Sequence, residues 1–200
     1  VLGTNISKTL LTHTSSVTLP TTLSDNAKIR IRDTNASYSG FVYGESGTFK
    51  VTGSFSILTP DINSKWAVGA TDKSITWTKK GNMGNANIYV DYNYPSGWGS
   101  PLFTGVDSTT GSKLWTPSIP DQVSNKVMIK ITDADKELDA FDLSDTFSII
   151  AGITVTRPTS GEIIHVDNNV TPTPYTVKWK TKGTAVTKVR LEYWHDTNGW

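Results

Sequence analysis

The feature that most constrains this chain is a stretch around a tryptophan that occurs twice. Ser-Ile-Thr-Trp-Thr-Lys-Lys-Gly ends at Gly81, and Thr-Val-Lys-Trp-Lys-Thr-Lys-Gly ends at Gly183. Residues alternate in polarity up to Trp77 and Trp179, which predicts a β-strand in each stretch. The two tryptophans are 102 residues apart (179 minus 77). A tryptophan strand that returns after about one hundred residues predicts an all-β fold of tandem immunoglobulin-like β-sandwich repeats.

Shorter matches divide the chain into repeats. Residues 27–33 match residues 127–133, and their alternation predicts that Ile29 and Ile31 face a core. The triplet at Phe55 matches the one at Phe147 with an offset of only 92, which indicates a loop eight residues longer in the first copy. The same alignment makes the second connection between repeats longer than the first, and predicts a hinge there.

We therefore predict three parts: residues 1–57 as the C-terminal half of one repeat, residues 58–150 as a complete repeat, and residues 153–200 as the N-terminal half of another. In the last part, residues 189–193 match residues 88–92 and predict a strand with Val189, Leu191 and Tyr193 toward the core. Two explanations fit the half repeats. The chain is a window of a longer array, or the halves of neighbouring molecules complete each other.

Composition restricts the class of function. The net charge of +1, from 19 basic and 18 acidic residues, removes the electrostatic case for nucleic acid as a partner. No apolar run approaches the ~20 residues needed to cross a bilayer, so no direct membrane insertion is expected. The absence of cysteine excludes disulfides and thiolate sites. Abundant Thr, Ser, Asn, Gly and Tyr are typical of β-rich proteins outside the cell or on its surface.

Catalytic signals are weak. His13, His165 and His195 are far apart in the sequence, and no pair of histidines has metal-binding spacing. Neither a G-x-S-x-G nucleophile motif nor a phosphate-binding glycine loop is present. We therefore expect a protein that is not an enzyme and that needs no cofactor, with calcium as the one exception to consider.

A set of short motifs resembles a known repeat. The motifs are Trp66-Ala67-Val68-Gly69, Ile75-Thr76-Trp77-Thr78, Gly81, Leu114-Trp115-Thr116-Pro117, residues 127–131 and residues 143–149. Their order resembles the immunoglobulin-like repeat of large bacterial and archaeal surface proteins. It is also similar to the N-terminal domain of fungal cell-wall synthesis proteins of the Ser/Thr-rich anchored family. The third copy departs from the pattern, because residues 161–165 stand where the Trp-x-Val-Gly element belongs. The resemblance implies an extracellular spacer or assembly module without catalytic residues.

Carboxylates are concentrated in the loop after residue 132. If calcium binds, its expected ligands are Asp133, Asp135, Glu137 and Asp139, because calcium takes six to eight oxygen ligands. The loop is not an EF-hand, since Ser144 stands where the bidentate glutamate belongs. A solvated acidic loop is the alternative, and the first copy lacks the cluster.

Tryptophans supply the remaining candidates. Trp77, Trp179 and Trp115 are expected in cores. Trp98, Trp194 and Trp200 are expected to face outward, where they would contact a sugar or another protein surface. Sequons that would carry glycans in an exported chain begin at Asn5, Asn35 and Asn169.

Together these observations favour a structural segment of a surface layer, stalk or filament that contacts other copies of itself or neighbouring repeats. The alternative is a carbohydrate-binding or adhesin module for cell-surface glycans, appended to a secreted enzyme or free of one.

Overall fold

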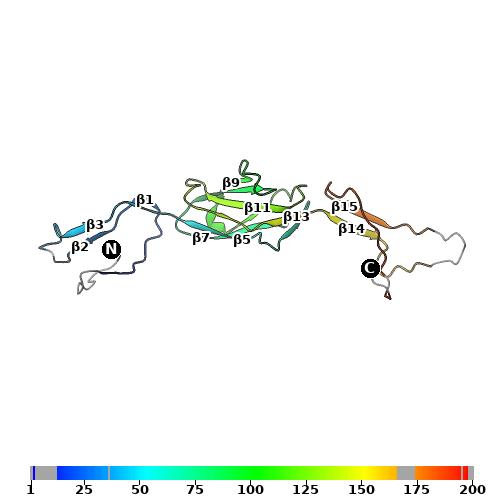
Figure 1. The fold of residues 1–200 in the computed structure, drawn as a ribbon, viewed down its shortest axis with the longest axis horizontal. Helices are drawn as coiled ribbons and strands as arrows, with labels where there is room; N and C mark the ends of the chain where they lie inside the picture. Colours follow the sequence, from blue (N-terminus) through cyan, green and yellow to red (C-terminus); the bar gives the residue numbers. More distant parts are fainter. Residues whose placement is uncertain (1, 3–12, 36, 166–173, 195, 198–200) are drawn as a thin grey trace.

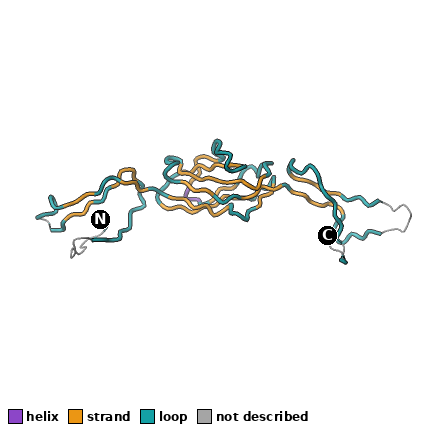
Figure 2. The backbone as a smooth tube through the Cα atoms, viewed as in Figure 1, coloured by secondary structure: helices purple, strands orange, loops and turns teal. Residues whose placement is uncertain are grey.

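The computed structural model describes residues 2, 13–35, 37–165, 174–194 and 196–197. Figures 1 and 2 show three parts in a row: an N-terminal segment (residues 13–51), a central unit (residues 54–150) and a C-terminal segment (residues 152–194). Within these ranges the one helix is a short 3-10 helix at Ser108–Thr110. No described helix is long and apolar enough to cross a membrane. The prediction of an all-β fold is confirmed.

The central unit contains two sheets. The smaller sheet has the strand order β10-β7-β5, and the larger one has the order β6-β13-β11-β8-β9, with β12 also paired to β11. The strands are β5 (Ser54–Thr59), β6 (Lys65–Ala67), β7 (Ser74–Lys80), β8 (Asn85–Asp91), β9 (Phe103–Asp107), β10 (Ser112–Leu114), β11 (Ser124–Asp133), β12 (Phe141–Leu143) and β13 (Phe147–Ile150). The pairing of β5 with β7 starts the central unit before residue 58.

The core of the central unit is built by side chains that alternate along the strands of both sheets. Ile75 and Trp77 of β7 are 0% and 3% exposed, and Ile129 and Ile131 of β11 are both 0% exposed. All four belong to one buried cluster. The Trp77 indole N–H donates to the carbonyl of Ser108 at 3.0 Å, so its one polar atom has a partner. The prediction that Trp77 lies in a core is confirmed, and Trp115 is equally buried.

Strands in the N-terminal segment pair in the same way as β11 pairs with β13 and β12 in the central unit. Strand β1 (Ser24–Ala27) pairs with β4 (Phe49–Val51), and β2 (Arg30–Arg32) pairs with β3 (Tyr43–Glu45). Ala27 lies opposite Phe49, as Val127 lies opposite Phe147. Arg30 lies opposite Glu45, as Lys130 lies opposite Leu143. Residues 24–51 therefore have the register of residues 124–149.

The C-terminal segment repeats the pairing of β5 with β7. Strand β14 (Gly152–Arg157) pairs antiparallel with β15 (Lys178–Lys182). Val155 lies opposite Trp179, as Ile57 lies opposite Trp77, and in each pair of strands the register shifts directly after that position. The repeated tryptophan stretch thus has the same strand partner in both places.

Side chains of the flanking segments are more exposed than the sequence predicts. Ile31 is 76% exposed and Trp179 is 39% exposed, although their counterparts Ile131 and Trp77 are buried. The predicted strand at residues 189–193 is absent, and Leu191 is 63% exposed. These predictions are wrong because each flanking segment, as far as it is described, contains only two-stranded sheets, whereas the buried cluster forms in the central unit with its three-stranded and six-stranded sheets.

The predicted difference between the two connections is also wrong. Two residues separate β4 from β5, and one residue separates β13 from β14. The match between Phe55 and Phe147 joined strands with different partners, since Phe55 lies on β5 and Phe147 on β13. Register makes Phe49 the counterpart of Phe147. Both connections are short, so the predicted longer hinge does not exist.

Candidate functional site

The first junction, between the N-terminal segment and the central unit, is formed by the turn after β7. Gly81 has a φ of +88°, a conformation that glycine adopts without strain. A Cβ at Gly81 would lie 3.0 Å from the Leu23 side chain and 3.1 Å from the Cα of Gly53. The next N–H, of Asn82, donates to the carbonyl of Thr21 at 2.9 Å. The turn therefore packs directly on the preceding segment.

The second junction, between the central unit and the C-terminal segment, has the same construction. Gly183 also has a φ of +88°, and its Cβ would lie 3.0 Å from Asp121 Oδ1 and 3.4 Å from the Ala151 Cβ. The N–H of Thr184 donates to Asp121 Oδ2 at 2.7 Å. Both glycines end the repeated tryptophan stretch. A glycine at the end of each tryptophan stretch was the signal in the sequence that could have located the junctions, but the sequence analysis did not assign it that role.

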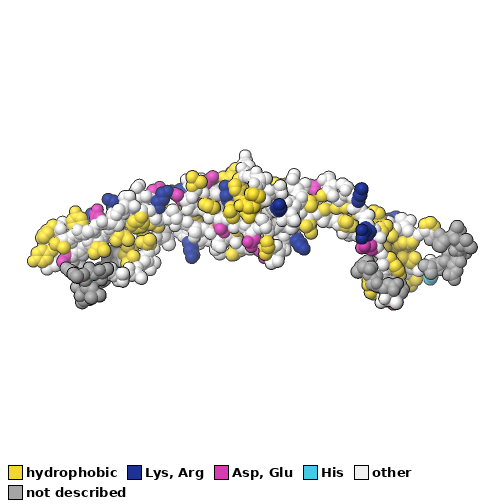
Figure 3. All heavy atoms as spheres, viewed as in Figure 1, with side chains coloured by type: hydrophobic (Ala, Val, Ile, Leu, Met, Phe, Trp, Pro, Cys, Tyr) yellow, Lys and Arg dark blue, Asp and Glu magenta, His cyan; other side chains and the backbone are white. Residues whose placement is uncertain are grey.

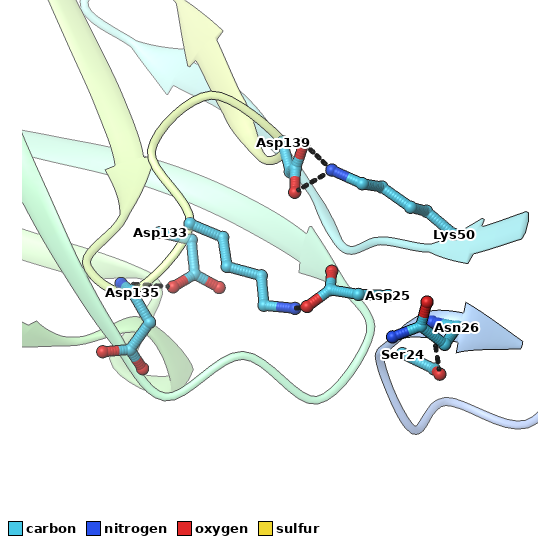
Figure 4. A network of polar contacts seen from close by, with 8 residues as sticks. Ser24, Asp25, Asn26, Lys50, Asp133, Asp135 and Asp139 are labelled. Carbon is cyan, nitrogen blue, oxygen red and sulfur yellow. Dashed lines mark hydrogen bonds and ion pairs between the residues drawn. The ribbon is translucent and has the colours of Figure 1, made fainter.

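Two ion pairs connect the two sides of the first junction (Figure 4). The Lys50 ammonium lies 2.9 Å from both carboxylate oxygens of Asp139, and the Lys136 ammonium lies 2.7 Å from Asp25 Oδ2. The bond from Lys136 holds the pKa of Asp25 below its ordinary value, and the bond to Asp139 raises the pKa of Lys50. These contacts join the acidic loop of the central unit to strands β1 and β4.

Three of the four predicted calcium ligands accept hydrogen bonds from different partners. Asp139 binds Lys50, and Asp133 is buried and accepts the N–H of Asp135 at 2.9 Å. Glu137 accepts from the Tyr89 hydroxyl and the Asn87 amide, which hold its pKa below the ordinary value. No group of three or more His, Cys, Asp or Glu side chains that could hold a metal ion occurs among the described residues. Calcium binding stays a prediction.

Trp98 lies in a cluster of aromatic and basic side chains on the larger sheet. The Lys130 ammonium lies 5.2 Å from the Trp98 ring centroid and 4.2 Å from that of Tyr89. The ring of Tyr94 lies 6.2 Å from that of Trp98. Trp98 is half-buried, so a lysine and a tyrosine already contact the ring that a sugar would use.

The turn that leads to Trp98 is held by a buried carboxylate. Asp91 is 2% exposed and accepts from the Asn93 N–H, the Ser96 hydroxyl and the Gly97 N–H at 2.9, 2.6 and 2.9 Å. Burial raises the pKa of Asp91, but the hydrogen bonds outweigh burial and hold the pKa below its ordinary value. A hollow of about 540 Å³ is lined by residues from 90 to 102, and Trp98 is not part of its lining.

We predict that Asp91→Asn lowers the free energy of unfolding of the central unit by about 1–3 kcal/mol at neutral pH, because an amide NH₂ cannot accept from Gly97. Since the pKa of Asp91 is lower folded than unfolded, its contribution is complete well above pH 3.8 and is lost as the pH falls through the folded-state value. The difference between parent and variant should therefore shrink in acid.

Urea unfolding at pH 7 and pH 3 measures this difference. Asp72→Asn is the matched control, because the side chain of Asp72 is 73% exposed. An equal loss of stability in both variants, or a loss in Asp91→Asn that does not depend on pH, would contradict the prediction.

The remaining predicted site residues are dispersed. Trp194 is 50% exposed on the C-terminal segment, far along the chain from Trp98. Asn35 is exposed in the turn after β2, where its side-chain oxygen accepts the N–H of Ser37 at 2.9 Å. Asn5, Asn169 and Trp200 lie outside the described residues. The structure therefore brings Trp98 and Trp194 into no common site.

In comparisons with known proteins, no protein-family model, curated protein or solved structure matches this chain.

Proposed function

We propose that this chain is a structural, non-catalytic segment of an extracellular repeat protein, such as a surface layer, stalk or filament. The observation that carries the proposal is the junction that occurs twice. Gly81 and Gly183 have the same φ, and each packs against the end of the preceding part of the chain. Because the same junction is built twice from matching positions, it would hold neighbouring units of the chain in a fixed orientation, which a spacer requires.

The shared registers support a tandem array of immunoglobulin-like sandwiches. In the central unit two sheets enclose one core, and the strand pairs of both flanking segments have the register of strand pairs within that unit. Under this interpretation each flanking segment is part of a repeat. The chain acts by stacking its repeats end to end and by associating with other copies.

Small-angle X-ray scattering at low protein concentration tests the spacer. We expect a single elongated particle with a narrow distribution of extents, because both junctions rest on direct packing and hydrogen bonds. Insertion of Gly-Ser-Gly after Ala151 is the matched control, since a flexible linker should broaden the distribution. A parent as broad as this insertion variant would contradict the proposal.

Removal of the ion pairs at the first junction tests whether the ion pairs or the glycine turn keep that junction rigid. At the second junction Asn125 and Ser148 stand where Asp25 and Lys50 stand at the first. The double variant Asp25→Asn, Lys50→Ser gives the first junction the residues of the second. We expect its scattering to match that of the parent, because exposed ion pairs contribute little.

The alternative function is carbohydrate binding, supported by the exposure of Trp194 and by the aromatic cluster at Trp98. A glycan array tests it. Binding that is lost in Trp98→Ala or Trp194→Ala, and kept when the exposed Leu138 is changed to Ala, would favour this alternative.

A further inference from the structure

We propose that the N-terminal segment of one molecule binds the C-terminal segment of a second copy, so that molecules join head to tail. The inference rests on the proposed function and deepens it, because it names the partner and the register of the contact. The two segments would pack as their matching strands pack inside the central unit.

The central unit supplies the template for this contact. Its β5 and β7 have the register of β14 and β15, and its β11, β12 and β13 have the register of β1 to β4. Within the unit these two sets bury one another, since Phe55 and Trp77 share one core cluster with Ile131 and Phe147. The two flanking segments of one chain thus correspond to the two halves of the core that is complete in the central unit.

The faces that would meet are apolar and open. Ile31 and Val42, which match the buried Ile131 and Ala140, are 76% and 45% exposed in the N-terminal segment. Val155 and Leu191 are 58% and 63% exposed in the C-terminal segment. Figure 3 shows hydrophobic side chains gathered over both outer parts of the molecule. Exposed apolar patches of this kind mark contact surfaces, and here the central unit indicates what covers them.

The template also fixes which residues face each other. In the central unit Ile88 and Val90 of β8 lie opposite Ile131 and Ile129 of β11. The positions that match Ile88 and Val90 are Val189 and Leu191, and those that match Ile131 and Ile129 are Ile31 and Ile29. Residues 189–193 would become a strand on pairing with β2 of the second copy.

Charges on the outer side of this strand pair predict an unusual salt dependence. The register places Lys28 opposite Glu192, but Arg30 opposite Arg190 and Arg32 opposite Lys188. Two like-charged pairs outnumber one opposite pair, and like charges directly opposite each other are unfavourable. Association should therefore strengthen as salt rises from about 0.1 M to about 1 M, where screening shortens the Debye length from ~10 Å to ~3 Å.

One polar contact of the template has no counterpart. The Ile57 N–H donates to Asp142 Oδ2 at 2.8 Å within the central unit, and Gly44 stands at the position that matches Asp142. Contact between molecules is consequently expected to be weaker than packing within the unit, and so to depend on protein concentration.

Light scattering of the 200-residue chain across a concentration series tests the proposal. The parent should grow into open oligomers, because a contact between two different surfaces does not close on itself. Ile31→Asp and Leu191→Asp should each weaken association at least about tenfold, since each places a charge in the contact. Ile62→Asp is the control, because Ile62 is 63% exposed in the central unit and lies outside both faces.

A mixing experiment tests the head-to-tail arrangement. The Ile31→Asp chain keeps its C-terminal face and the Leu191→Asp chain keeps its N-terminal face, so an equal mixture should form a dimer that cannot grow. The register is tested by disulfide formation between Lys28→Cys and Glu192→Cys, because residues opposite each other on paired strands lie within disulfide range. The parent has no cysteine that would compete.

Three results would overturn the proposal: a parent that stays monomeric at every concentration and salt, growth that persists in Ile31→Asp, or a mixture that stays monomeric. A monomer that still scatters as a narrow, elongated particle would remove this inference and leave the spacer function standing. A broad scattering distribution would remove the spacer function itself.

Discussion

Replacement of Trp77 by alanine is expected to lower the free energy of unfolding of the central unit by about 3–5 kcal/mol. Trp77 is 3% exposed, and its ring lies in the cluster between the two sheets. The variant removes that apolar surface, leaves a cavity, and deprives the Ser108 carbonyl of its indole donor. Urea unfolding followed by circular dichroism measures the loss.

Two controls identify the source of this loss. Trp77→Phe keeps a six-membered aromatic ring but removes the indole N–H, so it should cost less than Trp77→Ala. Trp179→Ala changes the matching residue of the C-terminal segment, which is 39% exposed. At a protein concentration where the chain is monomeric, Trp179→Ala should leave the unfolding midpoint of the central unit unchanged. An equal loss in Trp77→Ala and Trp179→Ala would mean that the two tryptophans have equivalent surroundings, against the structure.

The strands of the central unit could be predicted from the sequence because their apolar side chains find a core within the same chain, while their polar side chains face outward. Residues 74–81 alternate, and β7 forms at Ser74–Lys80 with Ile75 and Trp77 buried. The same pattern at residue 179 also formed a strand, but its apolar face stayed exposed. Alternation indicates which residues share a face, whereas burial depends on what packs on that face.

The junction contacts could not be read from sequence for a different reason. Lys50 and Asp139 are 89 residues apart in the sequence, and Lys136 and Asp25 are 111 apart. No local pattern links such pairs, because they meet only after both parts have folded. Composition alone leaves the acidic loop as either a calcium site or a solvated loop, and it does not indicate that Asp139 binds Lys50 or that Glu137 binds Tyr89.

The three-residue sequence match between Phe55 and Phe147 aligned the repeats wrongly, whereas the pairing register of whole strands aligns them correctly. Phe-Ser-Ile occurs at residues 55 and 147, but the first is on a strand paired with β7 and the second on a strand paired with β11. Three residues carry too little information to identify a strand, since many strands contain an apolar residue at every second position. The pairing register corrects the match, because it depends on both strands together.

Ile131 lies at the centre of the larger sheet, and a charge at this position should prevent folding of the central unit. Ile131 is 0% exposed, and β11 pairs with β8 and β12 on either side of it. Ile131→Asp would bury an unpaired carboxylate, which costs at least about 4 kcal/mol. The expected result is an unfolded central unit at neutral pH, seen as loss of near-ultraviolet circular dichroism.

Ile131→Val and Ile31→Asp separate the effect of charge from that of size and position. Ile131→Val removes one methyl group and should cost about 0.5–1.5 kcal/mol. Ile31→Asp makes the same change of charge one hundred residues earlier, at a side chain that is 76% exposed. In the monomer its unfolding midpoint should stay within about 0.5 kcal/mol of the parent. If Ile31→Asp unfolded the monomer as Ile131→Asp does, a second sheet would have to cover Ile31 within the same chain, and the face offered to a second copy would not be free.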